Sequence, residues 1–110
     1  MRDVKMAWDQ DLNTVNHTDG YLVKFPKYEA RYEAADVVGI ANMIKRFQEI
    51  IKTDLDLQPD RSFIALQVDG NEVLLSIYIR ETIYSLAVAT AEAFDQGMIY
   101  DREEDERVWL

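Results

Sequence analysis

The order of apolar and polar residues changes period several times along the chain, and each change predicts an element. Residues 3–8 alternate between apolar and polar side chains, which is typical of a short strand. Residues 9–20 are polar and end in an Asp-Gly turn signal. Residues 21–25 predict a second strand, and Pro26 predicts a break, a bulge or an edge position directly after it.

Residues 28–34 are compatible with two elements. Tyr28, Ala30 and Tyr32 alternate with charged residues as in a strand, whereas Tyr28 and Tyr32 also lie one helical turn apart. The strand is favoured because Asp36 is then in place to cap a helix that begins after it.

The clearest helix extends over residues 36–53. Gly39, in its first turn, lowers helix propensity and predicts close packing of this turn against the sheet. Apolar residues recur in the helix at spacings of three and four, which predicts one buried stripe. The members of this stripe are Val37, Ile40, Ile44, Phe47 and Ile51.

The strongest hairpin signal joins residues 62–68 to residues 72–79 through Asp69-Gly70-Asn71. Pairing Val68 with Val73 makes every pair on one face aliphatic, so the register is well specified. The aliphatic pairs are Val68–Val73, Leu66–Leu75 and Ile64–Ile77, and the mixed face pairs Phe63 with Tyr78, Ala65 with Ser76 and Gln67 with Leu74.

A second helix is predicted over residues 82–96, with Gly97 at its C-terminal cap. Its inner face would carry apolar and small side chains, which allow a close approach to the sheet. These side chains are Ile83, Leu86, Ala87, Ala91 and Phe94.

Together these elements predict an α+β fold in a single domain over residues 1–97. The expected architecture is an antiparallel sheet of about four strands with two helices on one face. Residues 98–110 form an acidic C-terminal extension that ends in an apolar anchor. The predicted helix starts lie 46 residues apart, which is compatible with a tandem ββα-ββα order.

Composition restricts the chemistry. The chain has no cysteine and one histidine, which excludes thiol catalysis and cysteine-based zinc sites and leaves little histidine acid–base chemistry. No apolar run approaches the ~20 residues that span a bilayer, and the first residues lack the apolar stretch of a signal peptide. We therefore expect a cytoplasmic protein with no membrane partner.

The net charge of −9 is concentrated toward the C-terminus, where the last thirteen residues hold five acidic and two basic side chains. Such a surface repels nucleic acid and anionic membranes, and it attracts basic partners over ~8 Å at physiological salt.

Metal and cofactor sites are not expected. A calcium loop that started at Asp54 would need glycine at its sixth position and glutamate at its twelfth, where Pro59 and Ala65 stand. The glycines form no phosphate-binding loop, and His17 lies in a polar stretch without the spacing of a catalytic triad.

The leading hypothesis is a small, non-enzymatic protein-binding inhibitor that occupies a basic surface of a partner, such as a nucleic-acid-binding groove. In size and charge the chain resembles phage-encoded inhibitors of host defence. The residues expected to bind the partner are acidic or amphipathic and cluster in two places, 54–60 and 100–109. They are Asp54, Asp56, Asp60, Tyr100, Asp101, Glu103, Glu104, Asp105, Glu106 and Trp109.

Two alternatives remain open. The first is a structural or assembly protein that self-associates, for example as a homodimer. The contact would be the mixed sheet face, with Phe63, Leu74 and Tyr78, or an edge strand. The second is a small carboxylate-based enzyme, which would need an acid such as Glu72 or Glu81 to be buried.

Overall fold

A computed structural model describes residues 4–54 and 56–110 of the chain. Asp3, at the start of the first predicted strand, and Leu55, inside the first predicted acidic cluster, lie outside these residues. Eight elements follow one another along the chain. They are β1 (Val4–Trp8), β2 (Tyr21–Glu33), α1 (Val37–Thr53), β3 (Ser62–Asp69), β4 (Glu72–Glu81), α2 (Tyr84–Ala93), β5 (Met98–Asp101) and β6 (Glu106–Trp109).

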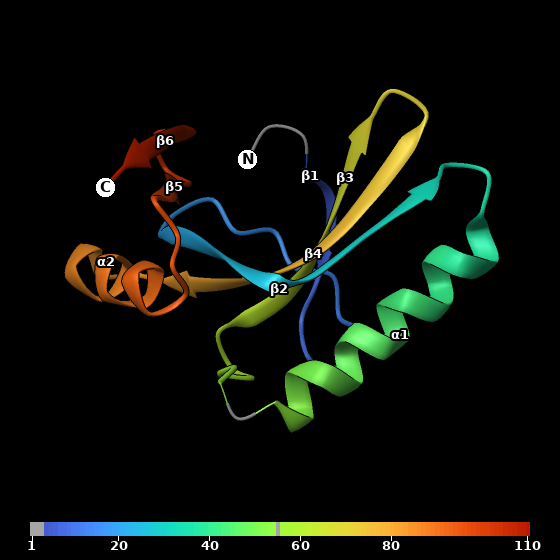
Figure 1. The fold of residues 1–110 in the computed structure, drawn as a ribbon, viewed down its shortest axis with the longest axis horizontal. Coiled ribbons are helices and arrows are strands. Elements are labelled where there is room, and N and C mark those ends of the chain that lie inside the picture. Colours follow the sequence, from blue (N-terminus) through green and yellow to red (C-terminus); the bar gives the residue numbers. More distant parts are fainter. Residues whose placement is uncertain (1–3, 55) are drawn as a thin grey trace.

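The strands form one antiparallel sheet of six strands in the order β1-β3-β4-β2-β5-β6 (Figure 1). The α+β class is confirmed, whereas the expected number of about four strands is wrong. The two additional strands are β5 and β6, within residues 98–110. Each strand has four residues and they flank a charged turn, so their sequence gives too few alternating positions to indicate a strand.

The hairpin of β3 and β4 has the predicted register. Val68 pairs with Val73, Leu66 with Leu75 and Ile64 with Ile77, and the mixed pairs of the other face are also those expected. Gly70, with φ of 60°, supplies the left-handed conformation that the tight connection needs. Local pattern alone therefore determined the pairing of β3 with β4.

Residues 28–34 are largely strand, because β2 runs without interruption from Tyr21 to Glu33. Its pairing with β4 changes register between Phe25 and Glu29, on either side of Pro26. The irregularity predicted at this proline is confirmed, and it lets one long strand bend along the sheet.

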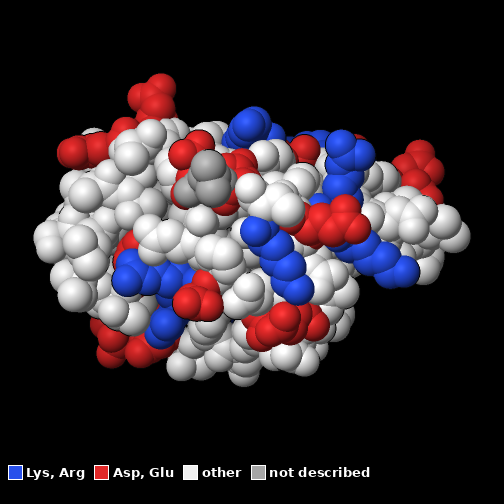
Figure 2. All heavy atoms as spheres, turned by 90° about the horizontal axis from the view of Figure 1, so that it is seen from below, with Lys and Arg blue, Asp and Glu red and all other residues white. Residues whose placement is uncertain are grey.

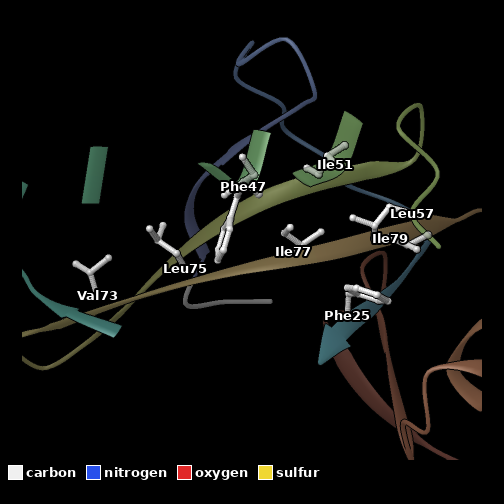
Figure 3. Close-up of a cluster of buried hydrophobic side chains, with 9 residues drawn as sticks. Phe25, Phe47, Ile51, Leu57, Val73, Leu75, Ile77 and Ile79 are labelled. Atoms are coloured by element: carbon white, nitrogen blue, oxygen red, sulfur yellow. The ribbon is translucent and has the colours of Figure 1, made fainter. Parts of the chain in front are cut away.

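Both helices pack on the same side of the sheet. Phe47 and Ile51 of α1 lie against aliphatic residues of β3 and β4 (Figure 3). Ala87 and Ala91 of α2 pack on Val23, whose partner across the ladder, Ile79, belongs to the same core as α1. The opposite side, which carries Phe63 and Tyr78, is called the helix-free face below.

Two expectations about the start of α1 are wrong, namely the role of Gly39 and the burial of Val37. Asp36 caps the helix by accepting a hydrogen bond from the N–H of Gly39 at 3.0 Å. A Cβ on Gly39 would collide with the Asp36 carboxyl group, 2.8 Å from its Cγ, so the glycine makes room for the cap and not for the sheet. Val37 is 69% exposed, and the buried stripe narrows to Phe47 and Ile51, with Ile40 and Ile44 partly buried.

Helix α2 is shorter than predicted. It covers Tyr84–Ala93 and ends with Phe94 as its cap and Asp95 in a left-handed conformation, φ 55°, so Gly97 does not terminate it. Ile83 and Leu86 are exposed, because the small residues Ala87 and Ala91 form the contact with the sheet. Within the described residues, neither helix is long and apolar enough to cross a membrane.

Candidate protein-binding surface

The predicted acidic extension is a hairpin, made of β5, the turn 102–105 and β6, and it is called the acidic hairpin below. β5 pairs with the start of β2 through Leu22–Tyr100 and Tyr21–Asp101. Ile99 is fully buried in the cluster beneath α2, and Val108 packs against that cluster. The apolar residues of the hairpin thus attach it to the core and position its charged turn.

The turn is built by its own acidic residues. The carboxylate of Asp101 accepts hydrogen bonds from the N–H groups of Glu103 and Glu104 at 3.1 and 3.2 Å. Asp105 adopts φ of 51°, a left-handed conformation that aspartate tolerates better than most residues, and it accepts a hydrogen bond from the hydroxyl of Tyr100. Two of the expected partner-binding acids therefore shape the turn.

Arg102 connects this turn by hydrogen bonds to the loop between β1 and β2, residues 9–20. Its backbone N–H donates to the carbonyl of Gly20 at 2.9 Å, and its Nε donates to the carbonyl of His17 at 2.8 Å. These contacts cross 82 and 85 positions of sequence, so the loop and the hairpin hold each other in place.

Three carboxylates point outward from the acidic hairpin. Glu103, Glu104 and Glu106 are exposed, and in the described part of the chain their carboxylates make no hydrogen bond or ion pair. Trp109 lies on the same hairpin with 72% of its surface exposed. The hairpin thus exposes an indole as well as unpaired carboxylates, and both kinds of group suit contact with another molecule.

The other predicted acidic cluster lies apart from the hairpin. The loop after α1 and the hairpin occupy different parts of the molecule in Figure 1, with α2 and the end of β4 between them. Asp54 accepts hydrogen bonds from the hydroxyl of Tyr28 at 2.6 Å and from the N–H of Asp56 at 2.9 Å. The bond from Tyr28 lowers the pKa of Asp54 and raises the pKa of Tyr28. Asp60 accepts a hydrogen bond from Gln10 at 3.1 Å, and both Asp56 and Asp60 are exposed.

On the lower face of the molecule, the acidic residues do not form one continuous field. Figure 2 shows acidic and basic side chains interspersed over the lower face of the molecule. Among residues 4–54 and 56–110, no group of three or more histidine or acidic side chains is arranged to hold a metal ion. Negative charge on this face is therefore interrupted by basic side chains.

The residues expected to mediate self-association are mostly inaccessible. Phe63 and Tyr78 are 3% and 6% exposed, with their rings stacked at 5.8 Å. The ring of His17 covers Phe63 at 5.0 Å, and Leu74 is partly exposed. Burial raises the pKa of Tyr78 far above its usual range, and its hydroxyl donates to Gln67 at 3.3 Å.

A cavity of about 370 Å³ lies on the helix-free face beside the acidic hairpin. Its residues come from β2, β3, β4, the acidic hairpin and the segment between α2 and β5, so no local sequence pattern could have indicated it. The lining residues are Leu22, Lys24, Gln67, Tyr78, Gln96, Met98, Tyr100, Asp105, Glu106 and Arg107.

Glu81 is the buried acid that an enzymatic alternative would need. It is 3% exposed and lines a cavity of about 290 Å³ that also contacts His17. Both of its oxygens are engaged, one by Arg61 at 2.8 Å and the other by the hydroxyl of Thr90 at 3.3 Å. This arrangement favours a structural ion pair over a proton donor.

Comparison of the chain with protein-family models, with curated proteins and with solved structures finds no match.

Proposed function

We propose that this chain is a non-enzymatic protein-binding inhibitor that acts in the cytoplasm and places the acidic hairpin on a basic surface of a partner protein. The observation that carries the proposal is the set of three exposed carboxylates, Glu103, Glu104 and Glu106. They lie on a hairpin that is hydrogen-bonded to the loop between β1 and β2 and that also exposes Trp109. Asp56 supplies a further exposed carboxylate on the loop after α1.

A nucleic-acid-binding groove is the favoured target. Duplex DNA presents one negative charge per ~1.7 Å of its axis, so grooves that bind it carry rows of lysine and arginine. The hairpin concentrates five acidic residues between Asp101 and Glu106, and the whole chain carries −9, which disfavours direct binding to nucleic acid. Phage-encoded anti-defence proteins include small acidic inhibitors of this type, and this chain resembles them in size and charge.

Charge reversal tests the proposal. The variant Glu103→Lys, Glu104→Lys, Glu106→Lys should lose a partner that the unmodified chain captures from a host lysate at low salt, because the attraction becomes repulsion. Capture by the unmodified chain should fall steeply between 50 and 200 mM salt, as electrostatic association requires.

The matched control is Glu33→Lys, Glu49→Lys, Glu92→Lys, which changes the net charge equally at three exposed glutamates on β2, α1 and α2. It should retain most of the captured partner. If the two triple variants behave alike, net charge and not the acidic hairpin governs binding, and the proposed site is wrong.

Self-association is the second candidate, and it is favoured by a specific observation on α2. Ile83, Tyr84 and Leu86 are exposed at the start of this helix. A dimer that persists at high salt in analytical ultracentrifugation, and that Leu86→Glu dissociates, would favour this function over the inhibitor.

A further inference from the structure

The two edge strands of the sheet, β1 and β6, differ in what lies along their outer sides. Along the outer edge of β1, the N–H of Val15 donates to the carbonyl of Ala7 at 2.9 Å, and Thr14 bridges to Trp8. Residues 13–15 therefore cover the C-terminal end of that edge. β6 pairs with β5 on one side, and no other strand among the described residues pairs with its second side. An uncovered edge offers backbone groups to a strand of another molecule.

The hydrogen-bonding groups that face outward can be assigned. The N–H of Leu110 donates to the carbonyl of Gly97 at 2.9 Å, next to the pair Met98–Trp109. Hydrogen-bonded and non-bonded pairs alternate along an antiparallel ladder, so Val108 and Glu106 bond to β5. Arg107 and Trp109 consequently direct their N–H and C=O groups to the open edge.

The side chains along β6 indicate the charge and polarity of a segment that could pair with it. Trp109 is a large exposed apolar group, and Glu106 and the neighbouring Glu104 are exposed carboxylates. A second copy of this chain would bring the same net charge of −9 to this edge, which disfavours pairing of two copies here. An extended segment with alternating basic and apolar residues meets the carboxylates with opposite charge and the indole with an apolar side chain.

We infer that β6 is a pairing edge, at which an extended basic segment of the partner adds a seventh strand to the sheet through the backbone of Arg107 and Trp109. This inference rests on the proposed function and specifies how the acidic hairpin would bind.

The test uses a fluorescent peptide of four Lys-Val repeats with blocked ends, followed by anisotropy at low salt. Arg107→Ala and Arg107→Pro both lack the guanidinium group, and only the proline variant lacks the outward N–H. Arg107→Pro should bind at least about tenfold more weakly than Arg107→Ala, because one buried peptide carbonyl loses its donor. A Lys-Pro repeat peptide of equal charge should bind the unmodified chain about tenfold more weakly as well, since its prolines cannot donate.

Amide exchange provides a measurement that does not depend on the proline variant folding. On addition of the Lys-Val peptide to the unmodified chain, the N–H groups of Arg107 and Trp109 should exchange at least about tenfold more slowly, and those of β1 should not change. Unchanged exchange at Arg107 and Trp109, or absence of binding to the unmodified chain, would overturn the inference.

The two proposals can fail separately. If the triple charge reversal at Glu103, Glu104 and Glu106 abolishes peptide binding while Arg107→Pro equals Arg107→Ala, the acidic contact holds and strand pairing is wrong. If the triple reversal leaves binding unchanged while Arg107→Pro weakens it, strand pairing holds without the electrostatic contact.

Discussion

Single residues in this chain take roles that their sequence neighbours do not indicate. His17 lies in a polar stretch, and the net charge of −9 would by itself favour its protonated form. In the structure its ring packs against Phe63, and its backbone carbonyl accepts from Arg102. Burial lowers the pKa of His17 most strongly, followed by the charge of Arg80, whereas Asp19 raises it. Desolvation and the nearby arginine thus outweigh the surrounding acidic residues.

The titration of His17 is the prediction at this scale. It is the one histidine of the chain, so its ring signals in an NMR titration are unambiguous, and their midpoint should fall below 6.5. The unfolded chain then binds a proton at a higher pH than the folded chain does. Stability contributed by the neutral ring is therefore present above pH 6.5 and is lost as the pH falls toward the folded-state pKa.

Urea unfolding at pH 7.5 and pH 5.5 measures this linkage. The unmodified chain should lose more free energy of unfolding between these values than His17→Gln, which has no titrating ring. An equal loss in both proteins, or a midpoint at or above 6.5, would contradict the assignment of His17 as a partly buried neutral ring.

At the scale of elements, the local pattern was sufficient to predict the register where aliphatic residues occupy every second position of a strand pair. The register of β3 and β4 follows from aliphatic residues on alternate positions, because a slip by one residue would turn all of them to the other face. The end of α2 could not be predicted from the pattern of apolar residues. Its core contact uses Ala87 and Ala91, and alanine does not distinguish a buried face from an exposed one.

The N-terminus of α1 gives the prediction at this scale, through the contact between Gly39 and the Asp36 carboxyl group. Gly→Ala in a helix normally stabilises by about 1 kcal/mol, and loss of an aspartate cap costs about 1 kcal/mol. Gly39→Ala alone should therefore be neutral or destabilising, because the new methyl group displaces the cap.

In the Asp36→Ala background the cap is already absent, so the same Gly39→Ala change should stabilise by about 1 kcal/mol. Chemical denaturation of the four proteins of this double-mutant cycle measures the coupling. Equal effects of Gly39→Ala in both backgrounds would show that the glycine does not serve the cap.

In the whole molecule, the acidic hairpin is the least firmly attached part of the sheet. β3 and β4 share eight paired positions, whereas β5 meets β2 at two. The remaining attachment comes from Ile99, from Val108 and from the bonds of Arg102 to residues 17–20. A region held by few contacts opens at lower free energy than the core does.

Hydrogen exchange tests this order of stability. Amides bonded between β5 and β6 should exchange faster than those between β3 and β4, and Arg102→Ala should accelerate the hairpin amides by about tenfold through loss of its bond to His17. Amides of β3 and β4 should not respond. Arg46→Ala, an exposed arginine on α1, is the control and should leave the hairpin unchanged. Acceleration throughout the sheet would instead show that the hairpin and core unfold together.

The sequence by itself determined the α+β class, the β3–β4 register, the strand irregularity at Pro26 and the capped start of α1. Each depends on side chains that are close together along the chain or that recur at a regular spacing. Only the tertiary structure decided that residues 98–110 complete the sheet, that Phe63 and Tyr78 are covered, and which carboxylates remain exposed. These outcomes depend on contacts across tens of residues, such as that of Arg102 with His17, and such contacts leave no periodic signal in the sequence.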